Sequence, residues 1–297
     1  MRFFLFGFFF ACALLAKGKG LQEMIQEYVE KFRAQVGVAV IIDHKDTVCV
    51  NNSADYPLMS VFKFHQAIAV ADQLHRRGMS MDTKIHIRKK DLKRNTYSPL
   101  RDSYPKGGVE LSVRELMRYT LQLSDNNACD ILFKHFGGPE TTDRYIRELG
   151  FHDFSIKYNE DDMHKNINRC YSNRTSPLEA ARLIDYIFVN EHLGQEFYEY
   201  IFQLMKNCET GKDRLVAPLL ATNAVVWHKT GTSDKNKNGQ WIATNDIGYI
   251  WAPNFHTYSI AVFVKDSFED AKTNADIIAG VSECVWKFLF TQPPVPR

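Results

Sequence analysis

The fold of this chain is decided by WIATNDIGYIWA at residues 241–252 and YSIAVFVK at residues 258–265. Both runs are rich in the β-branched and aromatic residues that favour strands. A third run of this kind, at residues 224–230, precedes them, and residues 271–290 follow with a helical pattern. The C-terminal part of the chain therefore predicts three strands and a closing helix.

The N-terminal part has the same character. Residues 21–32 place apolar side chains at a helical period, and residues 36–42 and 47–50 have the pattern of strands. Residues 150–175 are polar and lack periodicity, which predicts a long loop of the kind that often carries function. The remaining patterned segments are helical, and they cover residues 61–74, 112–123, 126–136, 139–149, 176–189 and 194–207.

Strands at both ends of the chain with helices between them predict an α/β (α+β) fold, in which an all-helical domain is inserted into a layer built from both ends. The expected α/β domain combines residues 21–58 with residues 212–297. The expected helical domain covers residues 59–211. The cleft between two such parts is a natural place for a site.

Composition excludes several classes of protein. The chain has 297 residues, 45% hydrophobic and 24% charged, which is ordinary for a globular protein and excludes disordered and low-complexity classes. Its 37 basic and 35 acidic residues leave a formal charge of +2, so no nucleic-acid partner is expected. Six cysteines are too few for a disulfide scaffold, and no C-x-x-C pair is present to hold zinc.

The N-terminus predicts export. Residues 3–16, FFLFGFFFACALLA, follow Arg2 and are too short a run to span a bilayer. A basic start, an apolar middle and small residues at the end are typical of a cleavable signal, here residues 1–16, with cleavage after Ala13 or Ala16. Lipid attachment at Cys12 and a buried N-terminal helix are the alternatives. The expected location is the periplasm or the exterior, with a lipoprotein as the alternative form.

After such cleavage an odd number of cysteines remains, which argues against complete pairing. Most of them are expected in the core as small hydrophobic residues. They are Cys49, Cys129, Cys170, Cys208 and Cys284.

One short motif has the layout of a serine nucleophile. Ser60-Val61-Phe62-Lys63 opens a predicted helix, so Ser60 and Lys63 lie on one face, where the amine can take the hydroxyl proton. The helix N-terminus adds a field that favours the developing anion. The plain alternative is a helix-capping serine beside a solvated lysine.

Two further motifs follow along the chain. Ser124-Asp125-Asn126 lies between two predicted helices, where its hydroxyl can pass a proton to a leaving nitrogen and its amide can hold a carbonyl. Lys229-Thr230-Gly231 ends a strand, and Lys229 with the hydroxyls of Thr230 and Thr232 suits a carboxylate ligand. Gly231 leaves room for a ligand near the backbone. A plain helix cap and a plain strand end are the alternatives.

Together, in this order, S-x-x-K, S-D-N and K-T-G form a known signature of class A β-lactamases and penicillin-binding proteins. Tyr97-Ser98-Pro99, Val113-Arg114-Glu115-Leu116 and Thr175-Ser176-Pro177 fit the same order. From about residue 37 to about residue 265 the chain resembles a class A serine β-lactamase. It is most similar to the extended-spectrum and cephalosporin-hydrolysing branch of anaerobic, gut-type bacteria.

The resemblance implies a mainly antiparallel sheet flanked by N- and C-terminal helices, and hydrolysis of penicillin- and cephalosporin-type antibiotics through an acyl-enzyme, which gives resistance. It implies a small-molecule β-lactam substrate, a monomer, no cofactor and no metal. The implied roles are Ser60 as nucleophile, the Ser60 and Thr232 backbone N–H groups as oxyanion hole, Lys63 and Ser124 in proton transfer, Asn126 on the acylamide, Lys229, Thr230 and Thr232 on the ring carboxylate, and Tyr97 as a wall of the cleft.

The resemblance also implies a carboxylate in the loop that activates the deacylating water. Glu160 fits that position, and Asp161 and Asp162 are the alternatives. His164 stands where many members of the family have Asn, which leaves open how the water is held. A solvated acidic loop is the plain alternative.

Two further positions differ from common family patterns. No Arg occurs on the strand that follows K-T-G, and Arg214 is placed to support the substrate carboxylate from upstream. A surface arginine beside a turn is the alternative. The occasional disulfide next to the nucleophile is absent, because Met59 and Ser233 occupy the two positions.

Sequence features argue against several rival functions. A penicillin-binding DD-peptidase would lack the loop carboxylate that Glu160 supplies, and a β-lactam-binding sensor domain would be joined to a transmembrane receptor. A zinc hydrolase would need H-x-H or H-E-x-x-H, and an α/β-hydrolase would need G-x-S-x-G; the sequence contains none of these.

Overall fold

A computed structural model describes residues 20–52, 55–190, 193–253 and 256–291. The predicted signal peptide and Cys12 lie outside these residues.

Strands from both ends of the chain form one five-stranded antiparallel sheet, as the sequence predicts. The strands are β1 (Gln35–Ile42), β2 (Asp46–Val50), β8 (Val225–Thr232), β9 (Trp241–Trp251) and β10 (Thr257–Ser267). Their order is β2-β1-β10-β9-β8, so the N-terminal hairpin pairs with the last strand, Ala39 opposite Ala261. Strand β8, which carries Lys229-Thr230-Gly231, lies at one edge of the sheet.

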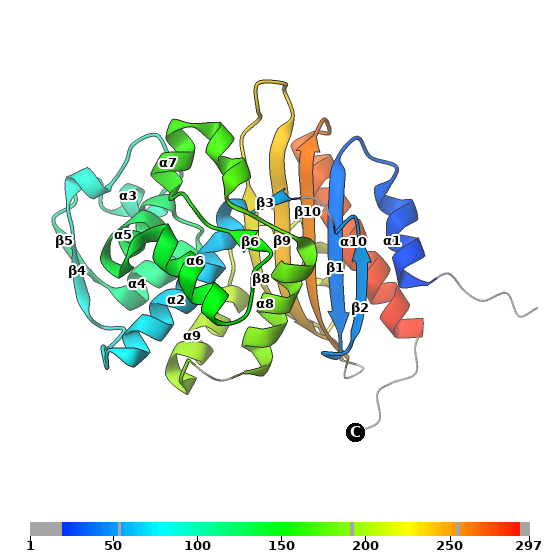
Figure 1. Cartoon of the computed structure of the whole chain (residues 1–297), viewed down its shortest axis with the longest axis horizontal. Coiled ribbons are helices and arrows are strands. Elements are labelled where there is room, and N and C mark those ends of the chain that lie inside the picture. The colour runs from blue at the N-terminus through cyan, green and yellow to red at the C-terminus, as the bar shows by residue number, and fades with distance from the viewer. Residues whose placement is uncertain (1–19, 53–54, 191–192, 254–255, 292–297) are drawn as a thin grey trace, which may run out of the picture.

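Helices cover both faces of the sheet (Figure 1). On one face, α1 (Leu21–Val29) and α10 (Ala271–Thr291) pack on side chains such as Val38 and Val262. On the other face, α8 (Pro177–Val189) packs on the alternate positions, among them Ala39 and Phe263. Successive strand side chains point to opposite faces, which explains why these strands are apolar almost throughout.

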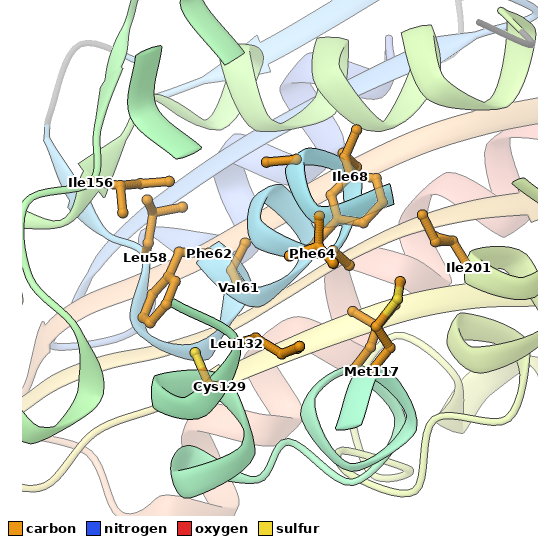
Figure 2. Packing of buried hydrophobic residues seen from close by; sticks show 14 of the residues in the cluster. Leu58, Val61, Phe62, Phe64, Ile68, Met117, Cys129, Leu132, Ile156 and Ile201 are labelled. Atoms are coloured by element: carbon orange, nitrogen blue, oxygen red, sulfur yellow. The ribbon is translucent and has the colours of Figure 1, made fainter. Parts of the chain in front are cut away.

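The remaining helices lie to one side of the sheet around α2 (Figure 1). Figure 2 shows Phe62, Phe64 and Ile68 of α2 packed among Met117, Leu132 and Ile201 from three other helices. The α-helices are α2 (Phe62–Arg76), α3 (Pro99–Ser103), α4 (Val113–Met117), α5 (Asn126–Phe136), α6 (Gly138–Glu148), α7 (Glu160–Lys165) and α9 (Gln195–Lys206). The 3-10 turns are η1 (Met59–Val61), η2 (Lys89–Asp91), η4 (Ile167–Ser172) and η5 (Ala217–Leu219).

Three details differ from the sequence prediction. The helix expected at 112–123 is α4 followed by a π-helical turn, η3 (Arg118–Gln122). The expected loop at 150–175 contains α7 and η4, which are too short to show a helical period. The sequence pattern also did not predict the short strands, which are β3 (Tyr56–Pro57), β4 (Lys84–Ile87), β5 (Val109–Ser112), β6 (Phe154–Ser155) and β7 (Arg174–Thr175).

Candidate active site

Ser60 lies in the 3-10 turn η1, one turn before the body of α2. Lys63 follows on α2, and its Nζ donates to Ser60 Oγ at 3.0 Å. The Lys63 side chain is completely buried, and its Nζ also donates to Ser124 O at 2.7 Å and Asn126 Oδ1 at 2.6 Å. The alternative of a solvated lysine is therefore wrong, because every partner of this ammonium belongs to the cleft.

Glu160 is the loop acid that reaches the same centre. Its Oε1 lies 2.9 Å from Lys63 Nζ and accepts from Ser60 Oγ at 3.4 Å. The carboxylate of Asp161 pairs with Lys165 at 2.7 Å, and that of Asp162 pairs with Arg169 at 3.4 Å. Of the three consecutive acids Glu160, Asp161 and Asp162, it is Glu160 that contacts both Ser60 and Lys63.

Asp130 of α5 holds the start of α7, and the sequence analysis missed it. Its two carboxylate oxygens accept from the backbone N–H groups of Glu160 at 2.8 Å and Asp161 at 2.9 Å. Burial, with the nearby charge of Glu160, raises the pKa of Asp130 to about 7. An acid within the otherwise apolar stretch Ala128–Phe133 was the available signal.

The three residues of the Ser124-Asp125-Asn126 turn make different contacts. Asp125 caps α5, accepting from Ala128 N at 2.8 Å, so the helix-cap reading is correct for this residue. Ser124 has a left-handed backbone (φ 60°), and its Oγ accepts from Lys229 Nζ at 2.9 Å. Asn126 contacts Lys63 through Oδ1. The cap fixes the turn, and the residues on either side of it contact the two lysines.

Lys229 approaches the site from β8 and is completely buried. Burial lowers the pKa of this ammonium to about 8. Thr230 bonds through Oγ1 to Thr210 Oγ1 at 2.6 Å, whereas the Thr232 side chain is exposed. Strand β8 thus places the buried Lys229 ammonium behind the cleft and the Thr232 side chain at its surface.

Arg214 supports the end of β8 from behind. Its Nη2 donates to Thr232 Oγ1 at 2.7 Å, and its Nη1 donates to Gly231 O at 3.1 Å and Asn245 O at 2.8 Å. The side chain is 9% exposed, so the alternative of a surface arginine is wrong.

The backbone that precedes Ser60 lies close to Gly231, where the sequence predicted room for a ligand. A Cβ added here would lie 2.7 Å from Leu58 O and 3.2 Å from Ser60 N. The space that the glycine leaves open is therefore taken by the backbone before the serine. Met59, in the same segment, has a left-handed backbone (φ 46°). The close approach places Ser60 N beside the end of β8, where the oxyanion hole was expected.

A pocket of about 430 Å³ opens between these elements. Ser60, Asn126, Glu160 and Thr232 line it, while Lys63, Ser124 and Lys229 lie behind its surface. Tyr97, 57% exposed, and His164 also line the pocket. In the described part of the chain no group of three or more His, Cys, Asp or Glu is arranged to hold a metal ion.

Comparison with known proteins gives this geometry its context. Residues 20–289 match the family described as Beta-lactamase enzyme family. A β-lactamase of Phocaeicola vulgatus is 41% identical over 91% of this chain and 84% of its own length. The β-lactamase VEB-1 of Pseudomonas aeruginosa is 36% identical over 93% of each chain.

This chain belongs to the β-lactamase family. Its fold is that of the class A enzymes: the crystal structure of the TLA-3 extended-spectrum β-lactamase superposes with a TM-score of 0.88 at 42% identity, over 91% of this chain and 98% of that one. A class A β-lactamase of Bacteroides cellulosilyticus gives a TM-score of 0.87 at 36% identity, over 93% of this chain and all of that one. The serine β-lactamase predicted from the motifs, and its extended-spectrum relatives, are thus confirmed.

The cysteines of this β-lactamase are free in the described residues. Cys129, Cys170 and Cys208 are buried, as expected, whereas Cys49 and Cys284 are half-buried. Next to the nucleophile, Ser233 Oγ accepts from Ala243 N at 2.9 Å. None of the described helices combines the length and the apolar character needed to cross a membrane.

Proposed function

We propose that this class A β-lactamase opens the lactam ring by attack of Ser60 Oγ on the ring carbonyl. The contact of buried Lys63 with both Ser60 and Glu160 carries this proposal. One of these two basic groups takes the hydroxyl proton, Lys63 directly or Glu160 through a water. The backbone N–H groups of Ser60 and Thr232 stabilise the oxyanion.

The leaving nitrogen needs a proton as the ring opens. Ser124 is the proposed donor, because its Oγ touches Lys229 and its carbonyl touches Lys63, so either lysine can replace the proton it gives up. The product of this step is an ester on Ser60.

Hydrolysis of that ester is the step that separates a lactamase from a penicillin-binding peptidase or sensor. We assign the base to Glu160, which lies against the Ser60 hydroxyl from the loop side of the pocket. A carboxylate there takes a proton from water as the water attacks the ester. Asp130 positions Glu160 through its bond to the Glu160 backbone.

Recognition of the substrate falls to the other residues of the pocket. We assign the ring carboxylate to Thr232 with Lys229 and Thr230 behind it, Arg214 holding Thr232 in place. Asn126 takes the acylamide, and Tyr97 forms a wall. Because relatives of this chain carry extended-spectrum names, cephalosporins are proposed as substrates together with penicillins.

The wider setting is proposed from the sequence. Residues 1–16 act as an export signal to the periplasm or exterior, and lipid attachment at Cys12 is the alternative. The mature protein acts as a monomer, with domains divided at residues 58–59 and 211–212.

The test is hydrolysis of a chromogenic cephalosporin by the purified protein, with intact-mass spectra taken during turnover. The expected result is rapid colour change with a transient adduct on Ser60, unaffected by a chelator. A peptidase or sensor would instead hold a long-lived adduct with almost no turnover. Loss of activity in the chelator, restored by zinc, would overturn the serine mechanism.

A further inference from the structure

A separate pocket of about 410 Å³ lies beside the edge strand β8, against the segment that follows α9. None of the residues that line it lines the active-site pocket. Its walls are largely aliphatic, including Val216, Leu219 and Val226, and its polar residues include Cys208 and His228.

Cys208 belongs to a buried thiol–imidazole–carboxylate cluster. Cys208 and His228 both line this pocket, and His228 Nδ1 lies 3.0 Å from Asp246 Oδ1 on the neighbouring strand β9. The three residues are 6%, 3% and 0% exposed. A thiol that shares a pocket with an imidazolium held by a carboxylate is in a setting that favours the reactive thiolate.

The charges around Cys208 favour its thiolate. Burial alone raises the pKa of this thiol, but the positive charges of His228 and Lys229 more than reverse the effect and lower it to about 7. His228 stays protonated beside Asp246, which raises the pKa of the imidazole to about 10 against the effect of burial. Burial raises the pKa of every other cysteine in the described ranges, Cys49, Cys129, Cys170 and Cys284.

The charged residues that line the pocket favour a negatively charged ligand. Lys206, Lys212 and His228 line it, and none of its lining residues, all of which the structure describes, is acidic. Basic groups around an apolar hollow favour a small organic anion.

We propose that this pocket is a second reactive site, at which Cys208 exchanges with small disulfides of negatively charged thiols. The Cys208 thiolate attacks one sulfur of the disulfide R–S–S–R. The new Cys208–S–R bond forms as the old S–S bond breaks, and R–S⁻ leaves. A free thiol in excess reverses the exchange.

Modification of Cys208 is expected to affect the β-lactam cleft in two ways, through hydrogen bonds and through charge. Cys208 Sγ lies 3.4 Å from Thr210 Oγ1, which bonds to Thr230 of the K-T-G strand at 2.6 Å. The Cys208 thiolate also favours the charged form of Lys229, the residue bonded to Ser124. A mixed disulfide removes the negative charge from the Cys208 sulfur and adds bulk beside Thr210, so modification lowers β-lactam turnover.

Labelling of the folded full chain tests the site. The probe is 5,5′-dithiobis(2-nitrobenzoate), an anionic aromatic disulfide, used from pH 5.5 to 9 with peptide mapping by mass spectrometry. Cys208 is expected to react first, with a rate that reaches half its maximum near pH 7. A Cys208 that stays unlabelled until denaturant is added, or a rate that rises with the ordinary thiol pKa of about 8.5, overturns the proposal.

Matched variants locate the reaction without relying on β-lactam chemistry. Cys208→Ser removes the fast phase, and Cys49→Ser, which alters a half-buried thiol outside the pocket, leaves it unchanged. Lys206→Ala with Lys212→Ala slows the anionic probe on the order of 10-fold and leaves neutral 4,4′-dipyridyl disulfide unaffected. Equal slowing of both probes overturns the anion preference.

Turnover of a chromogenic cephalosporin tests the link to the cleft. Activity is expected to fall in step with labelling of Cys208 and to return with dithiothreitol, and the Cys208→Ser enzyme is expected to resist the probe. Fully labelled enzyme with undiminished activity overturns the link. Because labelling is measured by mass, its result does not depend on whether the proposed β-lactam mechanism is correct.

Discussion

The two walls of the cleft each carry a fully buried lysine, and the two lysines have different partners. Lys63, on the helical wall, pairs with Glu160 at 2.9 Å and with Ser60 at 3.0 Å. Lys229, on the strand wall, bonds to the hydroxyl of Ser124 and the carbonyl of Thr230, and no carboxylate in the described residues lies within ion-pair distance of it. The first wall contains a closed set of proton-exchanging groups, and the second contains a cation without a carboxylate partner among the described residues.

The difference indicates a division of work. Groups that pass a proton must touch one another, because transfer occurs over hydrogen-bond distances. A cation that serves an anionic ligand is better left without a protein carboxylate, because a resident partner would compete with the ligand. We therefore expect changes on the helical wall to act on bond making and breaking, and changes on the strand wall to act on binding.

Ser60→Ala is expected to have the largest effect on turnover. The variant removes the nucleophile and leaves Lys63 with Ser124 O, Asn126 and Glu160 as partners, so the fold should persist. Turnover is expected to fall on the order of 10⁴–10⁶-fold, as for the loss of a serine nucleophile elsewhere. Intact-mass spectra should show no β-lactam adduct. An adduct on the folded variant would show that the nucleophile has been placed wrongly.

Glu160→Gln is expected to have the next largest effect. The substitution keeps the shape and removes the base, so deacylation should slow by about 10²–10⁴-fold and the adduct should accumulate. The measurement is a time course of adduct mass with a good cephalosporin. Asp161→Asn and Asp162→Asn are matched controls, because these acids pair with Lys165 and Arg169 instead. Trapping by either control, with normal turnover in Glu160→Gln, would move the base to that residue.

The strand wall should respond to pH through Lys229. Burial lowers the pKa of this group to about 8, so the ammonium is present below that pH and is lost as the pH rises through it. For substrates with a carboxylate, kcat/KM should fall above about pH 8, by at most about tenfold per pH unit for one proton. Lys229→Arg should move this limb to higher pH, because arginine keeps its charge. A limb at the same pH in the variant would assign the titration to another group.

Arg214→Lys is expected to have the smallest effect on activity, and that effect should be on substrate binding alone. The lysine keeps the charge but loses the fork that bonds Thr232 Oγ1 and two backbone carbonyls. Loss of such a bond costs about 0.5–1.5 kcal/mol, so KM should rise by about 2–10-fold with kcat almost unchanged. Asp213→Asn is the control on the exposed neighbour. A fall in kcat with unchanged KM would contradict the division between the walls.

Local patterns predicted most of the architecture. The strands at 36–42 and 258–265 and the closing helix are apolar at the periods of their elements, and the structure places them within a few residues of the predicted bounds. The failures were short elements: α7 has six residues and β7 has two, which is less than a pattern needs to show a period.

The candidate site was predictable only where a motif kept its residues close along the chain. Ser60 and Lys63 are three residues apart, and their contact follows from helical geometry. Asp130 contacts Glu160 across 30 residues, and Cys208, His228 and Asp246 come from three separate segments, so no spacing indicated either cluster.

By itself the sequence determined the strands, the long helices, the family and the residues able to do the chemistry, because periodicity, capping and short motifs are local properties of the chain. The tertiary structure alone decided which lysine has a carboxylate partner, which loop acid meets Ser60 and which cysteine has a lowered thiol pKa. Those outcomes depend on burial and on contacts between segments far apart in sequence, and burial sets the cost of every charge.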